Sequence, residues 1–232
     1  MFWAFVDASR ISDGRIRIDG AKGHHLARVL RIRPGERGVA VSAGREYDLE
    51  VVETRGDHIV GRVLGERPVG GEPANRVTLL QAVLPNPDFD AVIEAGTAVG
   101  IRDFVAVQAT RSIGRPAASR RLRWQAIAQS AAEQSHRGEI PEVAGPMDLP
   151  AALDRAAGTR LLALDPAASL PLLRALDGAP AYTLAVGPEG GWTDDERSAL
   201  HGRGALTVNL GPRILRARLA PIVAAAILVQ HR

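Results

Sequence analysis

The segment Val186-Gly187-Pro188-Glu189-Gly190-Gly191-Trp192-Thr193-Asp194-Asp195-Glu196 leaves an apolar β-type stretch, passes through glycines and proline, and enters a helix. Nearer the C-terminus, Asn209-Leu210-Gly211-Pro212-Arg213-Ile214-Leu215-Arg216 repeats that plan. Glycine lets a backbone approach a ligand closely, and proline stiffens a loop beforehand. Thr193 and Glu196 have the spacing of a capping box, so the first loop is expected to end at a helix N-terminus. Two such loops predict one site built from main-chain groups.

Each loop alone is also compatible with an ordinary strand-to-helix turn. The first loop lacks the G-x-x-x-x-G-K-S/T spacing of a phosphate loop and the G-x-G-x-x-G fingerprint of a dinucleotide site. The functional interpretation therefore depends on the presence of both loops, on their order in the chain and on their amino-acid sequences.

The two loops, followed by a C-terminal helix of small residues, resemble those of the SPOUT class of RNA methyltransferases. Within that class the chain most resembles the RsmE family, which methylates N3 of a uridine in 16S rRNA of the small subunit. Two further stretches are similar to the family's N-terminal signature and central helix. These are His25-Leu26-Ala27-Arg28-Val29-Leu30-Arg31-Ile32-Arg33-Pro34-Gly35-Glu36 and Trp124-Gln125-Ala126-Ile127-Ala128-Gln129-Ser130-Ala131-Ala132-Glu133-Gln134-Ser135-His136-Arg137.

Composition restricts the kinds of site and partner. The 232 residues include no cysteine, which excludes disulfides and thiolate metal sites, and the six histidines lack ligand spacing, so no metal is expected. The N-terminus does not have the pattern of a signal peptide, and the apolar run 219–229 is too short to span a bilayer. We therefore expect a cytoplasmic protein without membrane contact. Lys22 is the only lysine; the arginines favour RNA as a partner, although GC-rich coding explains them equally well.

Residues 2–63 have short β-type runs separated by glycine turns, which is typical of a small barrel. A helix over 23–30 is expected to place Leu26, Val29 and Leu30 on one face. The resemblance implies that residues 1–70 form a PUA-like RNA-binding β-barrel domain. Three arginines of this region are its candidate RNA-binding residues, with solvated surface charge as the alternative: Arg28, Arg31 and Arg33.

Residues 66–75 have the composition of a linker, with two prolines and two glycines. After them, strand-like and helix-like segments alternate, which predicts an α/β domain with a mostly parallel sheet and ligands at the carboxyl ends of its strands. The resemblance implies that residues 76–232 form a SPOUT methyltransferase domain with a trefoil knot.

The resemblance also implies S-adenosyl-L-methionine as the cofactor. Glycine-rich main chain suits a ligand that needs shape more than charge. Glu189 is alternatively a structural brace, and Ile214 and Leu215 are alternatively core residues. The residues expected to bind the cofactor are Leu164, Gly187, Pro188, Glu189, Gly190, Leu210, Gly211, Ile214 and Leu215.

Uridine N3 bears a proton near neutrality, and a nearby cation favours its loss. The catalytic candidates are therefore Arg111, Arg137 and Arg216, while Arg213 is assigned to RNA binding. Any of them alternatively binds phosphate, the commoner use of arginine beside RNA. His136 is a possible base, but a surface histidine is the more ordinary interpretation.

The chain departs from the family pattern in two places. After Ile-Leu-Arg, where relatives usually have a hydroxyl and an acid, it has Ala217 and Arg218. Around the first helix of the catalytic domain, where relatives usually have basic residues, it has Asn86, Asp88 and Glu94. These departures leave the cofactor loops intact and affect the side that is expected to contact substrate.

The 219–229 helix is apolar on almost every side and must be covered all round. The family's dimer implies a homodimer interface, and burial within one chain is the alternative. The sequence thus predicts a homodimeric methyltransferase of 16S rRNA in the small ribosomal subunit. Two alternatives remain: a SPOUT methyltransferase for another RNA position, and a non-catalytic RNA-binding or ribosome-assembly factor.

Overall fold

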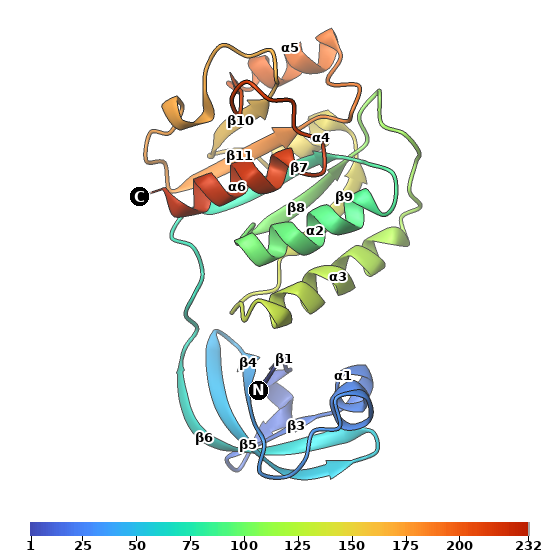
Figure 1. Ribbon diagram of the computed structural model, residues 1–232, viewed down its shortest axis with the longest axis vertical. Coiled ribbons are helices and arrows are strands. Elements are labelled where there is room, and N and C mark those ends of the chain that lie inside the picture. Colours follow the sequence, from blue (N-terminus) through green and yellow to red (C-terminus); the bar gives the residue numbers. More distant parts are fainter. Residues whose placement is uncertain (232) are drawn as a thin grey trace. The chain divides into compact units, whose positions relative to one another are not determined.

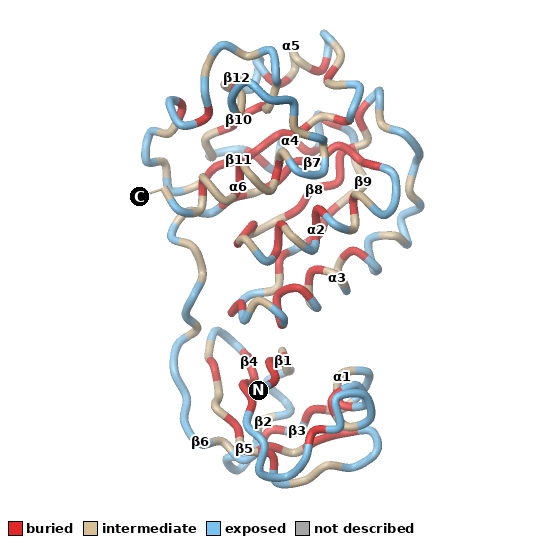
Figure 2. The backbone as a smooth tube through the Cα atoms, in the orientation of Figure 1, coloured by how far each residue is buried: buried red, intermediate tan, exposed pale blue. Residues whose placement is uncertain are grey.

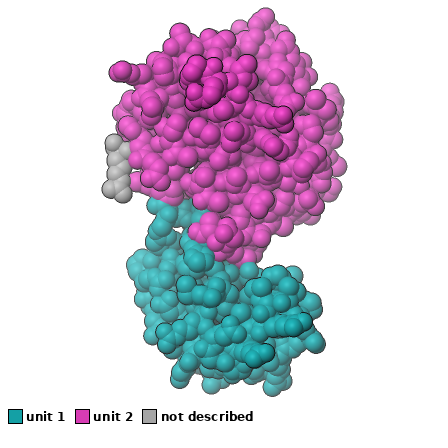
Figure 3. Space-filling view, in the orientation of Figure 1, with its two compact units in different colours: residues 1–72, 136–139 teal, residues 73–135, 140–232 magenta. Residues whose placement is uncertain are grey.

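The computed structural model describes residues 1–231 and divides into two compact units. Unit 1 comprises Met1–Glu72 with the short segment His136–Glu139, drawn in teal in Figure 3. Unit 2 comprises Pro73–Ser135 and the residues from Ile140 onward, drawn in magenta. Each unit has its own hydrophobic core.

Unit 1 is a six-stranded sheet with the order β1-β4-β5-β6-β3-β2. β1 and β4 are parallel and the other neighbours are antiparallel. Asp13-Gly14 and Ala43-Gly44 turn the chain with positive φ at both residues. Its elements are β1 (Phe2–Phe5), η1 (Ala8–Arg10), β2 (Ile11–Ser12), β3 (Arg15–Ile18), α1 (Gly20–His24), the π-helical η2 (His25–Val29), β4 (Arg37–Ser42), β5 (Arg45–Arg55) and β6 (His58–Pro68).

Two expectations for unit 1 need revision. The small sheet is present, but its two edge strands, β1 and β2, do not pair with each other within residues 1–231. The strand pairing therefore forms an open sheet and not the closed barrel that was expected. The prediction of one amphipathic helix over 23–30 is wrong, because the helix begins at Gly20 and widens into η2. Widening changes the angular spacing of side chains, so only Leu26 is buried, while Val29 and Leu30 are 60% and 53% exposed.

Unit 2 is a six-stranded, wholly parallel sheet with the order β12-β10-β11-β7-β8-β9 and helices on both faces (Figure 1). Its elements are β7 (Arg76–Ala82), α2 (Asp88–Val99), β8 (Asp103–Val107), α3 (Arg120–Gln134), β9 (Glu142–Met147), α4 (Leu149–Asp154), β10 (Arg160–Leu164), η3 (Leu172–Arg174), β11 (Ala181–Val186), α5 (Asp194–Gly202), β12 (Leu206–Val208) and α6 (Ala220–Gln230).

Alternation along the strands fills two cores, one on each face of this sheet. In β7, Leu79 joins the core beneath α2, α3 and α6, whereas Leu80 joins the core beneath α4 and α5. Burying both faces explains why these strands read as continuous apolar runs, and the red segments in Figure 2 follow them. The predicted parallel α/β architecture is therefore observed in unit 2.

Among the elements that were not predicted from the sequence are β9 and α4. Gly145 and Pro146 interrupt the apolar alternation of β9, and both residue types are uncommon inside strands. α4 is six residues long, too short for its helical period to stand out, although Asp148 caps it through the N–H of Ala151 at 2.9 Å.

Candidate functional site

Three strands of unit 2 end at the same level. In the parallel register Leu164, the last residue of β10, lies opposite Val186 of β11 and Val208 of β12. The loops that follow these strands therefore leave the sheet side by side at its carboxyl edge, where open α/β sheets bind ligands.

These three loops enclose a pocket of about 820 Å³, part of which is open to solvent. Its wall continues through Ala217 and Ala220 to the start of α6. Of the residues expected to bind a cofactor, Gly190 alone does not line the pocket. Those that do are Leu164, Gly187, Pro188, Glu189, Leu210, Gly211, Ile214 and Leu215.

The loop after β11 is held rigidly at both ends. Gly191 donates its N–H to the carbonyl of Pro188 at 2.8 Å, and Gly191 itself has a φ of 69°. The predicted capping box is present, because Glu196 accepts the N–H of Thr193 and Thr193 accepts that of Glu196. These hydrogen bonds fix the course of the loop between β11 and α5.

Glu196 ties this loop to the loop after β8. One carboxylate oxygen accepts the N–H of Thr110 and the other the N–H of Thr193, each at 2.8 Å. Burial raises the pKa of this carboxyl, but the hydrogen bonds from Thr110 and Thr193 outweigh burial and leave the pKa lowered. The ionised carboxylate is thus the form that braces the two loops.

Trp192 forms a wall of the pocket that the sequence did not single out. It is 2% exposed and packs so closely on Gly187 that a Cβ there would lie 3.3 Å from the indole ring. A side chain at Gly187 would therefore press on the tryptophan as well as enter the space left for a ligand. The sequence places both residues in one loop but does not show that they pack together.

The loop after β12 is anchored by Asn209. Its side-chain amide donates to the carbonyl of Ala168 at 2.7 Å and its Oδ1 accepts the N–H of Gly211 at 2.8 Å. Gly211 has a φ of 95°, which favours glycine. Asp165 and Arg197, which also line the pocket, lie 3.8 Å apart between their charged atoms. Sequence reasoning missed Asn209, Asp165 and Arg197 because pairing between loops is not visible in either loop alone.

The candidate arginines separate into different surroundings. Arg111 donates from its guanidinium to the carbonyl of Gly190 at 2.8 Å, so it lies against the cofactor loop. Arg213 lines the pocket, and Arg216 is exposed in the turn that leads into α6, where its carbonyl accepts the N–H of Leu219 at 2.8 Å. Ile214, between them, is 86% exposed.

Arg137 lies in unit 1 and is not among the pocket residues. Its side chain is 5% exposed and pairs with Glu72 at 2.6 Å, while its carbonyl accepts the indole N–H of Trp3 at 3.0 Å. His136 beside it stacks on Trp3 with ring centroids 4.8 Å apart. This arrangement joins the 136–139 segment to the body of unit 1.

The two departures from the family pattern meet in space. Arg218 donates to the carboxylate of Asp88, at the start of α2, at 2.9 Å. The acidic residue at the start of α2 and the basic residue after the β12 loop therefore pair with each other.

In unit 1 the candidate RNA-binding arginines are all exposed. Arg28 donates to the carbonyl of Gly56 at 3.1 Å, and Arg31 has a φ of 53°. Arg33 follows, with its N–H donating to Glu36 at 2.9 Å. Their guanidinium groups make no ion pair recorded for residues 1–231, in contrast to Arg10 and Arg17, which both pair with Asp19.

Metal and membrane sites are not indicated. No cluster of three or more His, Cys, Asp or Glu side chains suited to a metal ion occurs among the described residues. None of the helices described has the length and apolar character needed to cross a bilayer.

Comparison with known proteins places the chain in a family. Residues 71–229 match the model of an RNA methyltransferase domain. A "Ribosomal RNA small subunit methyltransferase E" from Mycobacterium bovis is 37% identical over 89% of this chain and 83% of its own length. One of the same name from Synechocystis is 34% identical over 95% of this chain and 75% of its own length.

Solved structures agree with this placement. The methyltransferase of that name from Neisseria gonorrhoeae, crystallised with S-adenosyl methionine, superposes with a TM-score of 0.90 at 28% identity, covering 98% of this chain and 96% of its own. A methyltransferase from Legionella pneumophila in complex with the same cofactor gives 0.89 at 26% identity, covering 98% and 96%. The chain therefore belongs to the RNA methyltransferase family that includes ribosomal RNA small subunit methyltransferase E.

Proposed function

We propose that this protein transfers a methyl group from S-adenosyl-L-methionine to N3 of a specific uridine in 16S rRNA of the small subunit. The observation that carries the proposal is the pocket made by three adjacent loops at the carboxyl edge of the parallel sheet. Relatives that are 37% and 34% identical bear the name of a ribosomal RNA small subunit methyltransferase.

The residues that line the pocket fit this cofactor in their chemistry. Gly187 leaves no side chain between the β11 loop and the pocket, and Leu164, Leu210 and Leu215 supply apolar walls for an adenine ring. When bound, the cofactor supplies a methyl group already activated by a sulfonium. The residues proposed to hold it are Leu164, Gly187, Pro188, Glu189, Gly190, Leu210, Gly211, Ile214 and Leu215.

The protein's own contribution is positioning and charge. We assign Arg111, held at the carbonyl of Gly190, and Arg216 to stabilising the uridine as it loses the N3 proton. Arg213, which lines the pocket, is assigned to RNA. Arg137 is left out of the proposed site because its guanidinium is buried in an ion pair with Glu72; its proposed role is structural.

Unit 1 is proposed to be a PUA-like RNA-binding domain, with Arg28, Arg31 and Arg33 contacting RNA. Its small, mostly antiparallel sheet and three exposed cations support this assignment. For unit 2 we propose the trefoil knot of the SPOUT class. The support is that Asn209 runs beside Pro171, accepting the N–H of Leu172 and donating to Leu170, both at 2.9 Å.

We further propose a cytoplasmic homodimer. Pro221, Ala224, Ala225 and Leu228 turn one side of α6 into the core of unit 2. The other side leaves apolar side chains partly exposed, including Ile222 and Ala226. Ile214 and Leu219, which precede α6 in the chain, are also exposed apolar residues. A second copy of the chain would cover this side of α6.

Light scattering across a concentration series tests the dimer. Ile222→Asp is expected to weaken association by more than about hundredfold, because it would bury an unpaired charge. Gln230→Asp, an exposed position on the same helix, is the matched control. A wild-type monomer at micromolar concentration that binds the cofactor tightly would contradict the dimer proposal.

Two measurements decide the function. Calorimetric titration with S-adenosyl-L-methionine separates a methyltransferase from a non-catalytic RNA-binding or assembly factor. Mass spectrometry of 16S rRNA from a deletion strain then locates the missing methyl group. Loss of N3-methyluridine at one position, restored by the wild-type gene, is expected; a missing methyl on another atom or base favours the alternative of a different RNA position.

A further inference from the structure

The segment between β8 and α3 has an unusual distribution of charge. From Phe104 through Ala132 the chain contains five arginines and no acidic residue. Ordinary protein surfaces intersperse the two signs, so a one-signed stretch creates a local positive field. The arginines are Arg111, Arg115, Arg120, Arg121 and Arg123.

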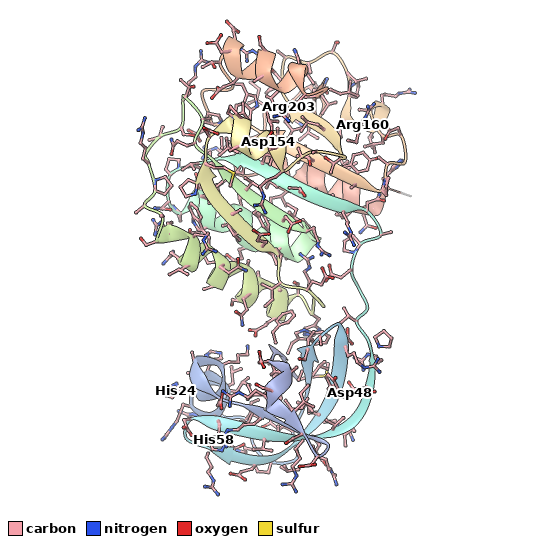
Figure 4. The ribbon with its side chains drawn as sticks, turned by 180° about the vertical axis from the view of Figure 1, so that it is seen from behind. His24, Asp48, His58, Asp154, Arg160 and Arg203 are labelled. Carbon is pink, nitrogen blue, oxygen red and sulfur yellow. The ribbon has the colours of Figure 1, made fainter. Side chains whose placement is uncertain are left out.

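Several other arginines of unit 2 are paired with a neighbouring carboxylate. Examples are Arg155 with Glu142, Arg197 with Asp194, Arg203 with Asp154, and Arg218 with Asp88; within the segment, Arg123 is paired with Asp90. Figure 4 labels Arg203 and Asp154, which face each other. The side chains of Arg115, Arg120 and Arg121 have no ion pair or hydrogen bond recorded within residues 1–231. They therefore keep their donors free for an external anion.

The segment begins at the carboxyl ends of the strands of the parallel sheet, the same end of the sheet that holds the pocket. It leaves the carboxyl end of β8, whose neighbour β7 pairs in parallel with β11, the strand that precedes Gly187. Arg111, at the start of the segment, touches Gly190 of the cofactor loop. The segment is mostly pale blue, and so exposed, in Figure 2. An RNA strand bound there would pass beside the pocket.

Apolar side chains are exposed among these arginines. Ile113 is 64% exposed and Leu122, at the start of α3, is 69% exposed. Unstacked bases of RNA loops stack on the planes of arginine guanidinium groups, and their faces are apolar like these exposed side chains. Free cations alternating with apolar side chains therefore favour single-stranded RNA as the ligand.

We propose that residues 111–121 form a binding site for the phosphate backbone of the substrate RNA on unit 2. Arg115, Arg120 and Arg121 contact phosphates, and Arg111 fixes the segment to the cofactor loop. The inference rests on the proposed function for the identity of the RNA. It supplies the substrate contacts on the catalytic unit that the departures near α2 left unassigned.

The test compares two charge-matched triple variants of the full-length chain. The segment variant is Arg115→Gln, Arg120→Gln and Arg121→Gln. The control is Arg76→Gln, Arg155→Gln and Arg203→Gln, three exposed arginines at or near the amino edge of the sheet. The probe is 16S rRNA purified from a strain that lacks the protein, with binding measured across a salt series.

We expect the segment variant to bind this RNA at least about tenfold more weakly and to reduce the slope of log K against log salt by about 2 to 3. KM for RNA rises and kcat stays the same, because the lost contacts are made equally in the ground and transition states. Affinity for S-adenosyl-L-methionine is unchanged. The control variant stays within about twofold of wild type in every measurement.

Wild-type affinity and salt slope in the segment variant would overturn the inference while leaving the proposed function intact, provided that the wild type methylates the RNA. Equal losses in both variants would also overturn it, since net charge would then be the cause. If the wild type transfers no methyl group, the proposed function fails and the binding data still decide the segment. Should the triple variant unfold, photo-crosslinking of 4-thiouridine RNA to the wild type decides; absence of crosslinks to 111–121 contradicts the inference.

Discussion

The pocket of unit 2 and the arginine surfaces are two different kinds of site. The pocket is shaped by main chain: glycines, prolines and loop hydrogen bonds anchored by Asn209 and Glu196. The surfaces at Arg28 to Arg33 and at 111–121 are long, exposed side chains with free charges. A backbone site is fixed by conformation and tolerates little strain, whereas a side-chain site is adjustable and sensitive to salt. Each kind should therefore fail in its own way when it is mutated.

The largest effect is expected from straining the backbone site. Gly211→Val places a β-branched residue at a φ of 95°, which costs on the order of 1–3 kcal/mol and moves the loop. Affinity for S-adenosyl-L-methionine should fall about 10- to 100-fold by calorimetry. Gly204→Val is the matched control, because Gly204 also has positive φ, nothing within 4 Å of a Cβ, and a place outside the pocket. Equal loss in both variants would argue against the site.

The converse experiment removes charge from unit 1. Replacing Arg28, Arg31 and Arg33 together with glutamine should weaken RNA binding by about tenfold and leave cofactor affinity unchanged. The matched control replaces Arg10, Arg17 and Arg62, which are already paired with Asp19 and Glu50. If cofactor affinity fell with RNA affinity, the separation between the two kinds of site would not hold.

A third prediction concerns the brace between loops. Since the pKa of Glu196 is lowered on folding, its ionised form stabilises the fold above the unfolded pKa, and that contribution is lost as pH falls through the lower folded pKa. Glu196→Gln should cost about 1 kcal/mol at pH 7 and flatten the acid side of the stability curve. Urea unfolding at pH 7 and at a pH well below 4.5 measures both. A variant with wild-type acid dependence would remove Glu196 from this role.

The smallest effect is expected at the exposed pair of Arg218 and Asp88. Arg218→Glu should lower the free energy of unfolding by less than about 1 kcal/mol, because such pairs are screened by solvent. Adding Asp88→Arg restores opposite charges and should recover most of the loss. A double-mutant cycle by chemical denaturation gives the coupling; a coupling of zero would mean that the contact contributes nothing.

The sequence predicts the features formed by main chain better than those formed by side chains. Glycine and proline determine the local backbone conformation of a loop. The loops after β11 and β12 and the Thr193–Glu196 capping box were therefore predicted correctly. Parallel strands buried on both faces were predictable from apolar runs. Side-chain contacts were not: Trp192 on Gly187 within one loop, and Asp165 beside Arg197 and Arg137 on Glu72 between distant segments, depend on the fold.

The sequence also could not predict which arginines have an ion-pair or hydrogen-bond partner. Arg115 and Arg123 look alike in the sequence, yet Arg123 donates from Nε and Nη2 to the carboxylate of Asp90, at 3.0 and 2.8 Å. Arg115 has no recorded side-chain partner among residues 1–231. In the same way, η2 exposes Val29 because a π-helical turn rotates it off the face that an α-helix would bury. Pairing and turn type are decided by tertiary context.

The contact between Asp88 and Arg218 also makes the segment before α6 depend on the start of α2, 130 positions earlier in the chain. Reversing either charge alone would place two like charges against each other, so a substitution in one segment acts on the other segment as well.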